Sequence, residues 1–364
     1  MGKLSSITVI IPAYKPDENL PSVIEGLKET GFTDFIVVND GSGPDYSGIF
    51  ENVGNIPGCT LLEHEVNRGK GAALKTAFSY CVEKRRSVRG VVTADADGQH
   101  RPEDISGCVE DMLESGDIVL GCRDFNTPGI PKRSVFGNKV SSKLYKLFYG
   151  LDLGDTQTGL RAIPQKYIKY LSEIPGDRYE YESNMLFGIS KYSLPLSERT
   201  IETVYEDENS SSHFRPLHDS MRIYKKLLLH GLGSLIATVI DIVMWLLLTG
   251  FLENHSVGKD KLFLMILAAC GARVISALFH YFYSFFVVFD REGGVASFFK
   301  YVLIAFGVLA LQLVVPAGTG IISSNLPVAV YILIKCVVSV IAFPFVFRIL
   351  HLSVFKKTPD SLKD

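Results

Sequence analysis

Two carboxylates in the first half of the chain have the spacing of a metal site. Asp95 and Asp97 stand two residues apart in the segment Thr93-Ala94-Asp95-Ala96-Asp97-Gly98-Gln99-His100, which follows the apolar run Gly90–Val92. Carboxylates this close repel each other, and a divalent cation that bridges to a diphosphate offsets that repulsion. Such oxygen ligands suit Mg²⁺ or Mn²⁺. The pattern therefore predicts a Mg²⁺ or Mn²⁺ site at Asp95 and Asp97, although a bare Asp-x-Asp also occurs by chance.

Other polar residues follow apolar runs in the same way. Asp40, in Asn39-Asp40-Gly41-Ser42, could accept hydrogen bonds from a base or ribose, or could belong to an ordinary turn. Arg123 could bind phosphate oxygens with two parallel hydrogen bonds, or could form a surface ion pair. The glycine-rich segment 67–72, Asn-Arg-Gly-Lys-Gly-Ala, opens a predicted helix, which favours an anion site there.

The elements that must position these residues have the pattern of an α/β domain. Short apolar runs bounded by turn residues alternate with stretches of helical spacing such as Leu20–Thr30 and Gly71–Lys84. The runs are Thr8–Ile11, Asp34–Val38, Thr60–Glu63, Gly90–Ala94 and Asp117–Leu120. Strands buried on both faces look like this, so we expect a mostly parallel sheet. Ligands of such sheets bind beyond the carboxyl ends of the strands, where the polar residues above stand.

The composition indicates a second, membrane-embedded part. Of the 364 residues, 47% are hydrophobic and only 21% are charged, whereas about 25% charged residues is usual. Four apolar runs after residue 222 exceed the roughly 20 residues that cross a hydrocarbon core. We expect a soluble domain over residues 1–222 and a membrane domain over 223–357, with helices at about 227–252, 262–289, 298–322 and 328–350. A net charge of −2 gives no footprint for nucleic acid.

With these residues placed, the first 222 residues resemble a family 2 glycosyltransferase with the GT-A fold, in the branch that glycosylates polyprenyl phosphates and includes dolichyl-phosphate mannosyltransferases. The resemblance covers roughly residues 5 to 222. Its motifs are those at 9–14, 37–42, 67–71 and 95–100, together with Asp-Thr-Gln-Thr-Gly-Leu-Arg at 155–161 and Ser-His-Phe-Arg-Pro at 212–216.

The resemblance implies a role for each matching residue. Pro12, Tyr14 and Asp40 would bind the nucleotide base and ribose. The residues implied for the diphosphate are Lys70 near it, Asp95 and Asp97 with the metal, Gln99 beside them, and His213 and Arg215, which would close over the phosphates. Arg123 and Arg133 would bind the acceptor phosphate or the leaving diphosphate. The loop from Asp155 to Arg161 would border the donor sugar and the acceptor, with capping of that loop as the structural alternative for Asp155.

The membrane half contains an internal repeat. Lys226 and Gly233 match Lys300 and Gly307 at an offset of 74, and 274–289 matches 340–355 at an offset of 66, so each half is predicted to be a helical hairpin. The repeat resembles the small GtrA-like membrane domain. Asp241, Arg273 and Lys335 lie inside the predicted spans, and we expect Asp241 to pair with Arg273 or with Lys335, against a polar path for a lipid phosphate.

Basic residues near the helix ends predict the orientation. Nine lie on the side of the soluble domain and two in the opposite loops. The nine are Arg215, Arg222, Lys225, Lys226, Arg291, Lys300, Lys356, Lys357 and Lys363, and the two are Lys259 and Lys261. This asymmetry, with a first apolar run too short for a signal peptide, predicts a multi-pass protein of the cell (inner) membrane with the catalytic domain and both termini in the cytoplasm.

Together these features predict inverting transfer of a hexose from a nucleotide sugar, with UDP-glucose favoured by the resemblance, to a membrane polyprenyl phosphate. A GDP-mannose-dependent mannosyltransferase and a flippase whose soluble domain only binds nucleotide sugar stay open as alternatives. A processive polysaccharide synthase is disfavoured because such relatives carry a QxxRW segment, whereas Trp245, the single tryptophan here, lies inside an apolar run. The resemblance also makes a homo-oligomer, a dimer or a tetramer, a prediction.

Overall fold

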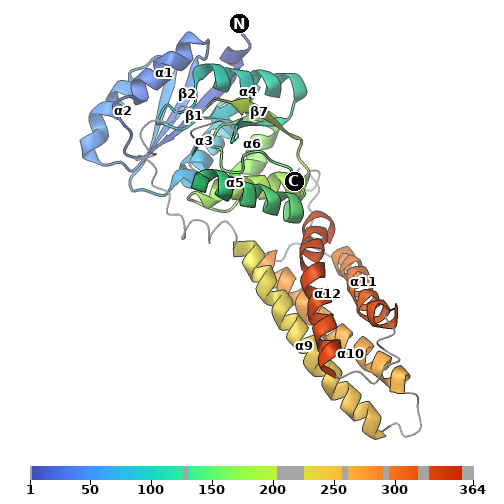
Figure 1. The fold of residues 1–364 in the computed structure, drawn as a ribbon. Coiled ribbons are helices and arrows are strands. Elements are labelled where there is room, and N and C mark those ends of the chain that lie inside the picture. Colours follow the sequence, from blue (N-terminus) through green and yellow to red (C-terminus); the bar gives the residue numbers. More distant parts are fainter. Residues whose placement is uncertain are drawn as a thin grey trace. The chain divides into compact units, whose positions relative to one another are not determined.

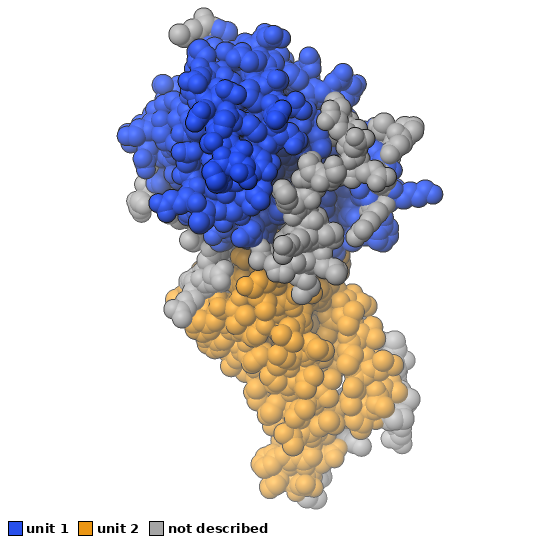
Figure 2. Space-filling model, turned by 90° about the vertical axis from the view of Figure 1, so that its left-hand side faces the viewer, with its two compact units in different colours: residues 1–146, 151–223, 362–364 blue, residues 147–150, 224–361 orange. Residues whose placement is uncertain are grey.

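The computed structural model describes residues 2–125, 130, 132–202, 225–255, 261–289, 295–318 and 328–354. The chain divides into two compact units. Unit 1 comprises residues 1–146, 151–223 and 362–364, and unit 2 comprises residues 147–150 and 224–361 (Figure 2).

Unit 1 is built on a seven-stranded, mostly parallel sheet with the strand order β3-β2-β1-β4-β6-β5-β7. The strands are β1 (Ile7–Ala13), β2 (Asp34–Asp40), β3 (Cys59–His64), β4 (Gly90–Thr93), β5 (Ile118–Arg123), β6 (Arg161–Pro164) and β7 (Leu196–Ile201). β6 lies antiparallel between β4 and β5, and the other pairs are parallel. The expected fold class is therefore confirmed, and the five expected strands are present.

Helices cover both faces of this sheet (Figure 1). They are α1 (Leu20–Glu29), α2 (Ser47–Gly54), α3 (Lys70–Lys84), α4 (Pro102–Ser115), α5 (Lys132–Leu144), α6 (Gln165–Ser172) and α7 (Glu180–Tyr192). Short 3-10 turns lie at Leu4–Ser6 and Pro44–Tyr46, and a π-helical turn lies at Tyr145–Tyr149. α1, α2 and α4 share one apolar core against the strands, whereas α3 packs with α6, α7, β1 and β2.

Alternation along the central strands supplies both cores. Val9, Ile11 and Val37 are fully buried and pack with α1, α2 and α4. Ile10 and Ile36, whose side chains point to the other face of the pleat, are also fully buried. Because both faces of β1 and β2 are covered, these strands appear in the sequence as continuous apolar runs.

Unit 2 holds four helices that are long and apolar enough to cross a membrane. They are α9 (Lys225–His255), α10 (Lys261–Tyr283), α11 (Val295–Gly318) and α12 (Val328–Ile349). α10 and α12 each continue into one π-helical turn, Ser284–Val288 and Leu350–Val354. These two turns start 66 residues apart, at the offset of the sequence repeat, so the repeated sequence forms repeated local structure.

The charged residues within these helices are not all paired. Lys335 Nζ lies 2.6 Å from Asp241 Oδ2, and Ser276 Oγ donates a hydrogen bond of 3.2 Å to the other carboxylate oxygen. Of the two pairs predicted for Asp241, the one with Lys335 forms and the one with Arg273 does not.

Candidate active site

The polar residues predicted to carry the chemistry meet at one edge of the sheet in unit 1. β1, β2, β4 and β5 run in the same direction, so their carboxyl ends lie at this edge. β6 runs the opposite way, which brings its first residue, Arg161, and the loop before it to the same edge. The Thr93 hydroxyl at the end of β4 donates a hydrogen bond of 2.7 Å to the Gly159 carbonyl. The acidic motif and the 155–160 loop are therefore held side by side.

Asp95 forms a charged triad with Lys70 and Glu182. Lys70 Nζ lies 2.6 Å from Asp95 Oδ1 and 3.0 Å from Glu182 Oε1, with all three side chains largely buried. Burial alone would lower the pKa of Lys70, but the two carboxylates outweigh it and raise that pKa. Burial likewise opposes ionisation of Asp95, yet Lys70, His100 and Arg123 hold the pKa of Asp95 well below its usual value. Asp95 is therefore anionic and Lys70 cationic at neutral pH.

Gly159 is required by the close approach of its loop to this triad. A Cβ at this position would lie 2.8 Å from Asp95 Oδ2 and 3.0 Å from Lys70 Nζ. No side chain fits there without moving Asp95 or Lys70.

The residues after Asp95 fit a divalent cation. Burial, followed by repulsion from Asp95, raises the pKa of Asp97, which is the mark of a carboxylate that lacks a nearby cation. The Gln99 backbone N–H donates to Asp97 Oδ1 at 3.1 Å, which fixes the turn. In the described parts of the chain, no three His, Cys, Asp or Glu side chains gather as a metal cage. Two carboxylates alone suit Mg²⁺ or Mn²⁺ held largely by phosphate and water.

Arg123 is fixed by Asp155. Its Nε and one terminal nitrogen donate to the two Asp155 oxygens at 2.7 and 3.2 Å. Asp155 has 0% exposure and also accepts a hydrogen bond of 2.9 Å from the Gln157 backbone N–H. In this arrangement the carboxylate contacts protein groups, so it positions the arginine and caps its own loop.

The loop that contains Asp155 is itself held by two neighbouring side chains. Asn138 on α5 donates to the Gly154 carbonyl at 2.5 Å and accepts from the Thr156 N–H at 3.3 Å. Glu198 on β7 accepts from the Gly154 N–H at 2.9 Å. Elements on both sides thus fix the backbone around Asp155.

Arg161 and Asp40 also contact protein groups. Arg161 is 1% exposed, and its guanidinium donates to the carbonyls of Thr158 and Glu182. Asp40 is 2% exposed and accepts hydrogen bonds from the backbone N–H groups of Arg68 and Gly69 at 2.9 and 2.7 Å. Asp40 thereby fixes the loop that starts α3 and presents Lys70. Direct contact of Arg161 and Asp40 with a nucleotide sugar stays a prediction.

The remaining predicted residues are divided between described and undescribed segments. Pro12 and Tyr14, at and just after the end of β1, are partly exposed at the same edge of the sheet. The side chain of Arg133 and all of His213 and Arg215 lie outside the described residues. Nothing is therefore added to the predictions for these three.

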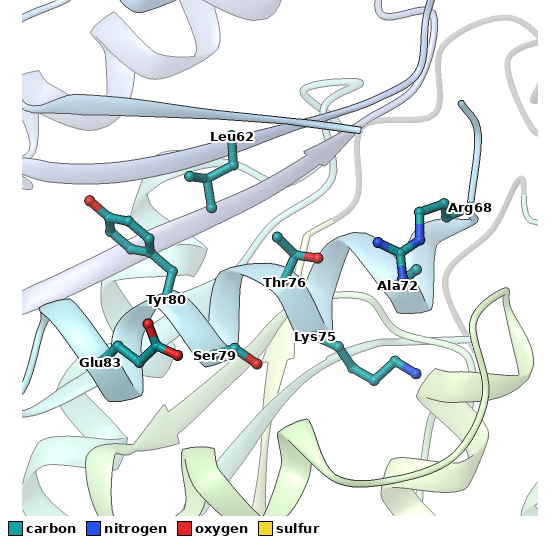
Figure 3. A pocket seen from close by; sticks show the side chains of 8 residues that line it. All are labelled: Leu62, Arg68, Ala72, Lys75, Thr76, Ser79, Tyr80 and Glu83. Atoms are coloured by element: carbon teal, nitrogen blue, oxygen red, sulfur yellow. The ribbon is translucent and has the colours of Figure 1, made fainter. Parts of the chain in front are cut away.

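A shallow groove lies elsewhere on unit 1. It has a volume of about 420 Å³ and is lined from β3, α3 and the loop before α3, as Figure 3 shows. Its lining residues include Leu62, Arg68, Lys75 and Tyr80 but neither Asp95 nor Asp97. We therefore place the chemistry at the acidic motif and not in this groove.

Three residues of the site were not predicted from the sequence. Glu182 lies on α7, and Asn138 and Glu198 lie on α5 and β7. None of them follows an apolar strand ahead of a turn, which was the signal used for the others. Glu182 becomes visible only when α7 is packed beside α3.

Comparison with known proteins agrees with this geometry. The sequence model of glycosyl transferase family 2 matches residues 8–171. An uncharacterized protein of Methanocaldococcus jannaschii is 31% identical over 210 residues, which are 56% of this chain and 84% of that protein. The UDP-N-acetylglucosamine–dolichyl-phosphate N-acetylglucosaminyltransferase of Methanococcus voltae is 29% identical over 63% of this chain and 98% of that protein.

A bacterial relative and a solved structure are also similar to this chain. The undecaprenyl-phosphate mannosyltransferase of Micrococcus luteus is 26% identical over 54% of this chain and 81% of that protein. A glucosyl-3-phosphoglycerate synthase of Mycobacterium tuberculosis, solved with Mn²⁺ and UDP, gives a TM-score of 0.45 at 16% identity, over 62% of this chain and 80% of that one. With the family match and the 31% identical relative, the chain belongs to glycosyl transferase family 2 and is a glycosyltransferase.

Proposed function

We propose that this glycosyltransferase transfers a hexose from a nucleotide sugar to the phosphate of a membrane polyprenyl phosphate, with inversion at the anomeric carbon. One observation carries the proposal. The same chain has an acidic pair beside Lys70 and Arg123 in unit 1 and four helices able to cross a membrane in unit 2. The first suits a nucleoside diphosphate as leaving group, and the second suits an acceptor that stays in the bilayer.

The acceptor explains why the site needs no strong general base. A phosphate monoester has a second pKa of about 6, so it is already a nucleophile at neutral pH. The task of the protein is then to bring two anions together and to stabilise the departing diphosphate. Direct attack of a phosphate oxygen on the anomeric carbon breaks the bond to the diphosphate and inverts that carbon.

The residues of the site can be assigned to these tasks. Lys70 and Arg123 would bind phosphate oxygens, with Arg133 as a further predicted cation. Asp95 and Asp97 would hold Mg²⁺ or Mn²⁺, which supplies positive charge to the diphosphate when bound. Asp155 and Arg161 would keep Arg123 and the 155–160 loop in place, and that loop would border the sugar.

We further propose that unit 2 is a GtrA-like membrane domain that starts at about residue 223, with the catalytic domain and both termini on the cytoplasmic side of the cell membrane. The nine-to-two distribution of basic residues supports this orientation. The repeated π-helical turns support the duplication expected of such a domain. A dimer or tetramer stays a prediction.

The donor is proposed to be a UDP-hexose, with UDP-glucose tested first. The curated relatives named above act, by their names, with UDP-N-acetylglucosamine or in mannosyl transfer, so UDP-N-acetylglucosamine and GDP-mannose belong in the same panel. Purified protein is incubated with each donor and polyprenyl phosphate in detergent, and the mass of the lipid product is measured. A product of polyprenyl phosphate plus one hexose is expected, whereas a flippase alone would make no glycolipid.

The acidic motif is tested with D97A. We expect at least a hundredfold loss of transfer, on the order of one lost electrostatic stabiliser in a dehydrated site. D45A, which removes an exposed carboxylate of unit 1, is the matched control and should transfer at the wild-type rate. Undiminished transfer by D97A would disprove the assignment of the metal site.

A further inference from the structure

Arg273 is a charged residue in the middle of a membrane-spanning helix. Its Nε is buried, and within the described residues its side chain makes neither a hydrogen bond nor an ion pair. Arg273 stands 12 residues after the start of α10 and 15 before the end of the π-helical turn that follows it. At a rise of about 1.5 Å per residue, both ends lie at least about 18 Å away. Snorkelling to the interface serves residues near helix ends and does not serve this one.

The protein supplies no acid for Arg273. In the described part of unit 2, the membrane helices contain two acidic residues, Asp241 and Glu253. Asp241 is 1% exposed and already paired with Lys335, and Glu253 stands two residues from the end of α9. A second copy of the chain would bring the same two acids and no new one. The charges buried at mid-depth, Asp241, Lys335 and Arg273, therefore sum to one excess positive charge.

Gln312 on α11 is a second unpartnered group at nearly the same depth. It is 6% exposed, and both its amide nitrogen and its amide oxygen are buried without a hydrogen-bond partner among the described residues. A buried amide of this kind is costly unless something binds it. Leu313, its neighbour in sequence, packs against the cluster that contains Ala269 and Ala272 of α10, one turn from and next to Arg273.

The helix register places Gln312 near Arg273. His280 Nδ1 on α10 and Tyr301 Oη on α11 are 2.9 Å apart, which puts these two residues at the same depth. From this level Gln312 lies 11 residues along α11, and Arg273 lies 7 residues back along the antiparallel α10. The difference is about 6 Å, or one helical turn, and α10 packs against α11.

We propose that Arg273 and Gln312 form a binding site for the phosphate group of a membrane lipid inside the bilayer. Phosphate is the common anionic group of membrane lipids, and the planar guanidinium binds it with two parallel hydrogen bonds. A phosphate on Arg273 neutralises the excess charge, and the Gln312 amide donates to a remaining oxygen. If the proposed function holds, this lipid is polyprenyl phosphate or its glycosylated product. An ordinary glycerophospholipid has the same phosphate chemistry.

The test measures lipid binding by the full-length protein in detergent with native mass spectrometry. The probes are polyprenyl phosphate, phosphatidylglycerol and polyprenol, which has no phosphate. For R273Q we expect affinity for polyprenyl phosphate to fall at least about tenfold, equal to about 1.4 kcal/mol. R273K keeps the charge and should retain much of the binding. K300Q removes an exposed lysine near one end of α11 and is the matched control for loss of a positive charge, with affinity close to wild type.

The outcomes separate the possibilities. Polyprenol should bind wild type and R273Q equally; a parallel loss of polyprenol binding would show that the helices have repacked and would overturn the proposal. Wild-type affinity of R273Q for both phospholipid probes would also overturn it. Should R273Q not fold, Q312L is the second variant, and an unchanged affinity for polyprenyl phosphate in both Q312L and R273K would count against the site.

The two phosphate lipids distinguish the source of the ligand. Preference for polyprenyl phosphate over phosphatidylglycerol identifies the site with the substrate of the enzyme. Equal affinity for both supports a general phosphate site and removes the assignment to the substrate. Binding that depends on Arg273 in a protein that transfers no sugar from any donor would refute the proposed function and leave the phosphate site standing.

Discussion

At the scale of single residues, the site consists of groups that face a ligand and groups that hold them. Lys70, Asp95, Asp97 and Arg123 belong to the first kind, and the sequence predicts all four because each follows a strand or starts a helix at one sheet edge. The buried residues Asp40, Asp155 and Arg161 stand in the same motifs but bind protein groups. Motif position cannot separate these two kinds, because burial depends on how distant segments pack.

Replacing Gly159 tests the tight contact between its loop and the charged triad. In G159A the new methyl group would displace Asp95 or Lys70, so we expect the rate of sugar transfer to fall at least about tenfold, as when a catalytic group is misplaced by about 1 Å. Transfer is measured in detergent with a saturating donor. The melting temperature should change little, because Asp95 and Lys70 are partly solvent-accessible and can adjust.

The control for this variant is G26A. A Cβ on Gly26 would meet its nearest neighbour, Pro102, at 3.9 Å, an ordinary contact, so transfer should stay at the wild-type level. A wild-type rate for G159A as well would contradict the placement of the loop.

At the scale of elements, buried strands were the most predictable part of the fold. β1, β2 and β5 extend one to three residues past the predicted apolar runs, up to Ala13, Asp40 and Arg123, because polar or small residues at the strand ends still pair with their neighbours. β6 and β7 were not predicted. β6 has four residues and starts with Arg161, and β7 is largely polar, so neither shows a continuous apolar run. Their pairing with β4 and β5 is a tertiary effect.

The start of α3 offers a test of how one helix positions Lys70. A Cβ on Gly71 would lie 2.5 Å from the Tyr181 Cβ and 2.9 Å from the Arg178 carbonyl oxygen of the segment that leads into α7. We expect G71A to cost about 1–3 kcal/mol of stability through this overpacking. At about 2–4 °C per kcal/mol, the melting temperature of the full-length protein should drop measurably. Transfer should fall too, since the adjacent Lys70 moves with the backbone.

G48A provides the matched helix variant. Gly48 lies on α2, and a Cβ there meets nothing within 4 Å, so its melting temperature should stay or rise slightly, in keeping with the better helix propensity of alanine. An equal melting temperature for G71A and wild type would show that α3 and α7 are not packed as described.

At the scale of the whole molecule, composition alone separated a soluble part from a membrane part. Hydropathy predicted the four long helices because the bilayer demands long apolar runs. The partner of Asp241 could not be chosen from the sequence, since Arg273 and Lys335 are both at mid-depth and only the rotation of each helix decides between them. The choice of Lys335 leaves Arg273 unpaired in the described structure.

The orientation of the whole chain is tested by labelling cysteine variants in intact cells with a membrane-impermeant maleimide. We expect K259C, in the short loop after α9, to react, because the sparse basic residues place that loop outside the cytoplasm. D45C, on the exposed surface of unit 1, should react only after the cells are permeabilised. Labelling of D45C in intact cells with no labelling of K259C would reverse the proposed orientation.

The length of α9 links the enzyme to the thickness of its membrane. With 31 residues the helix is about 46 Å long, whereas the hydrocarbon core measures about 30 Å. A helix that is too long for its bilayer tilts, protrudes or thickens the lipid around it. Each adjustment changes the depth of every group on the helix, including Asp241. Acyl-chain length and sterol content therefore become variables of this enzyme's activity, as substrate concentration is for a soluble one.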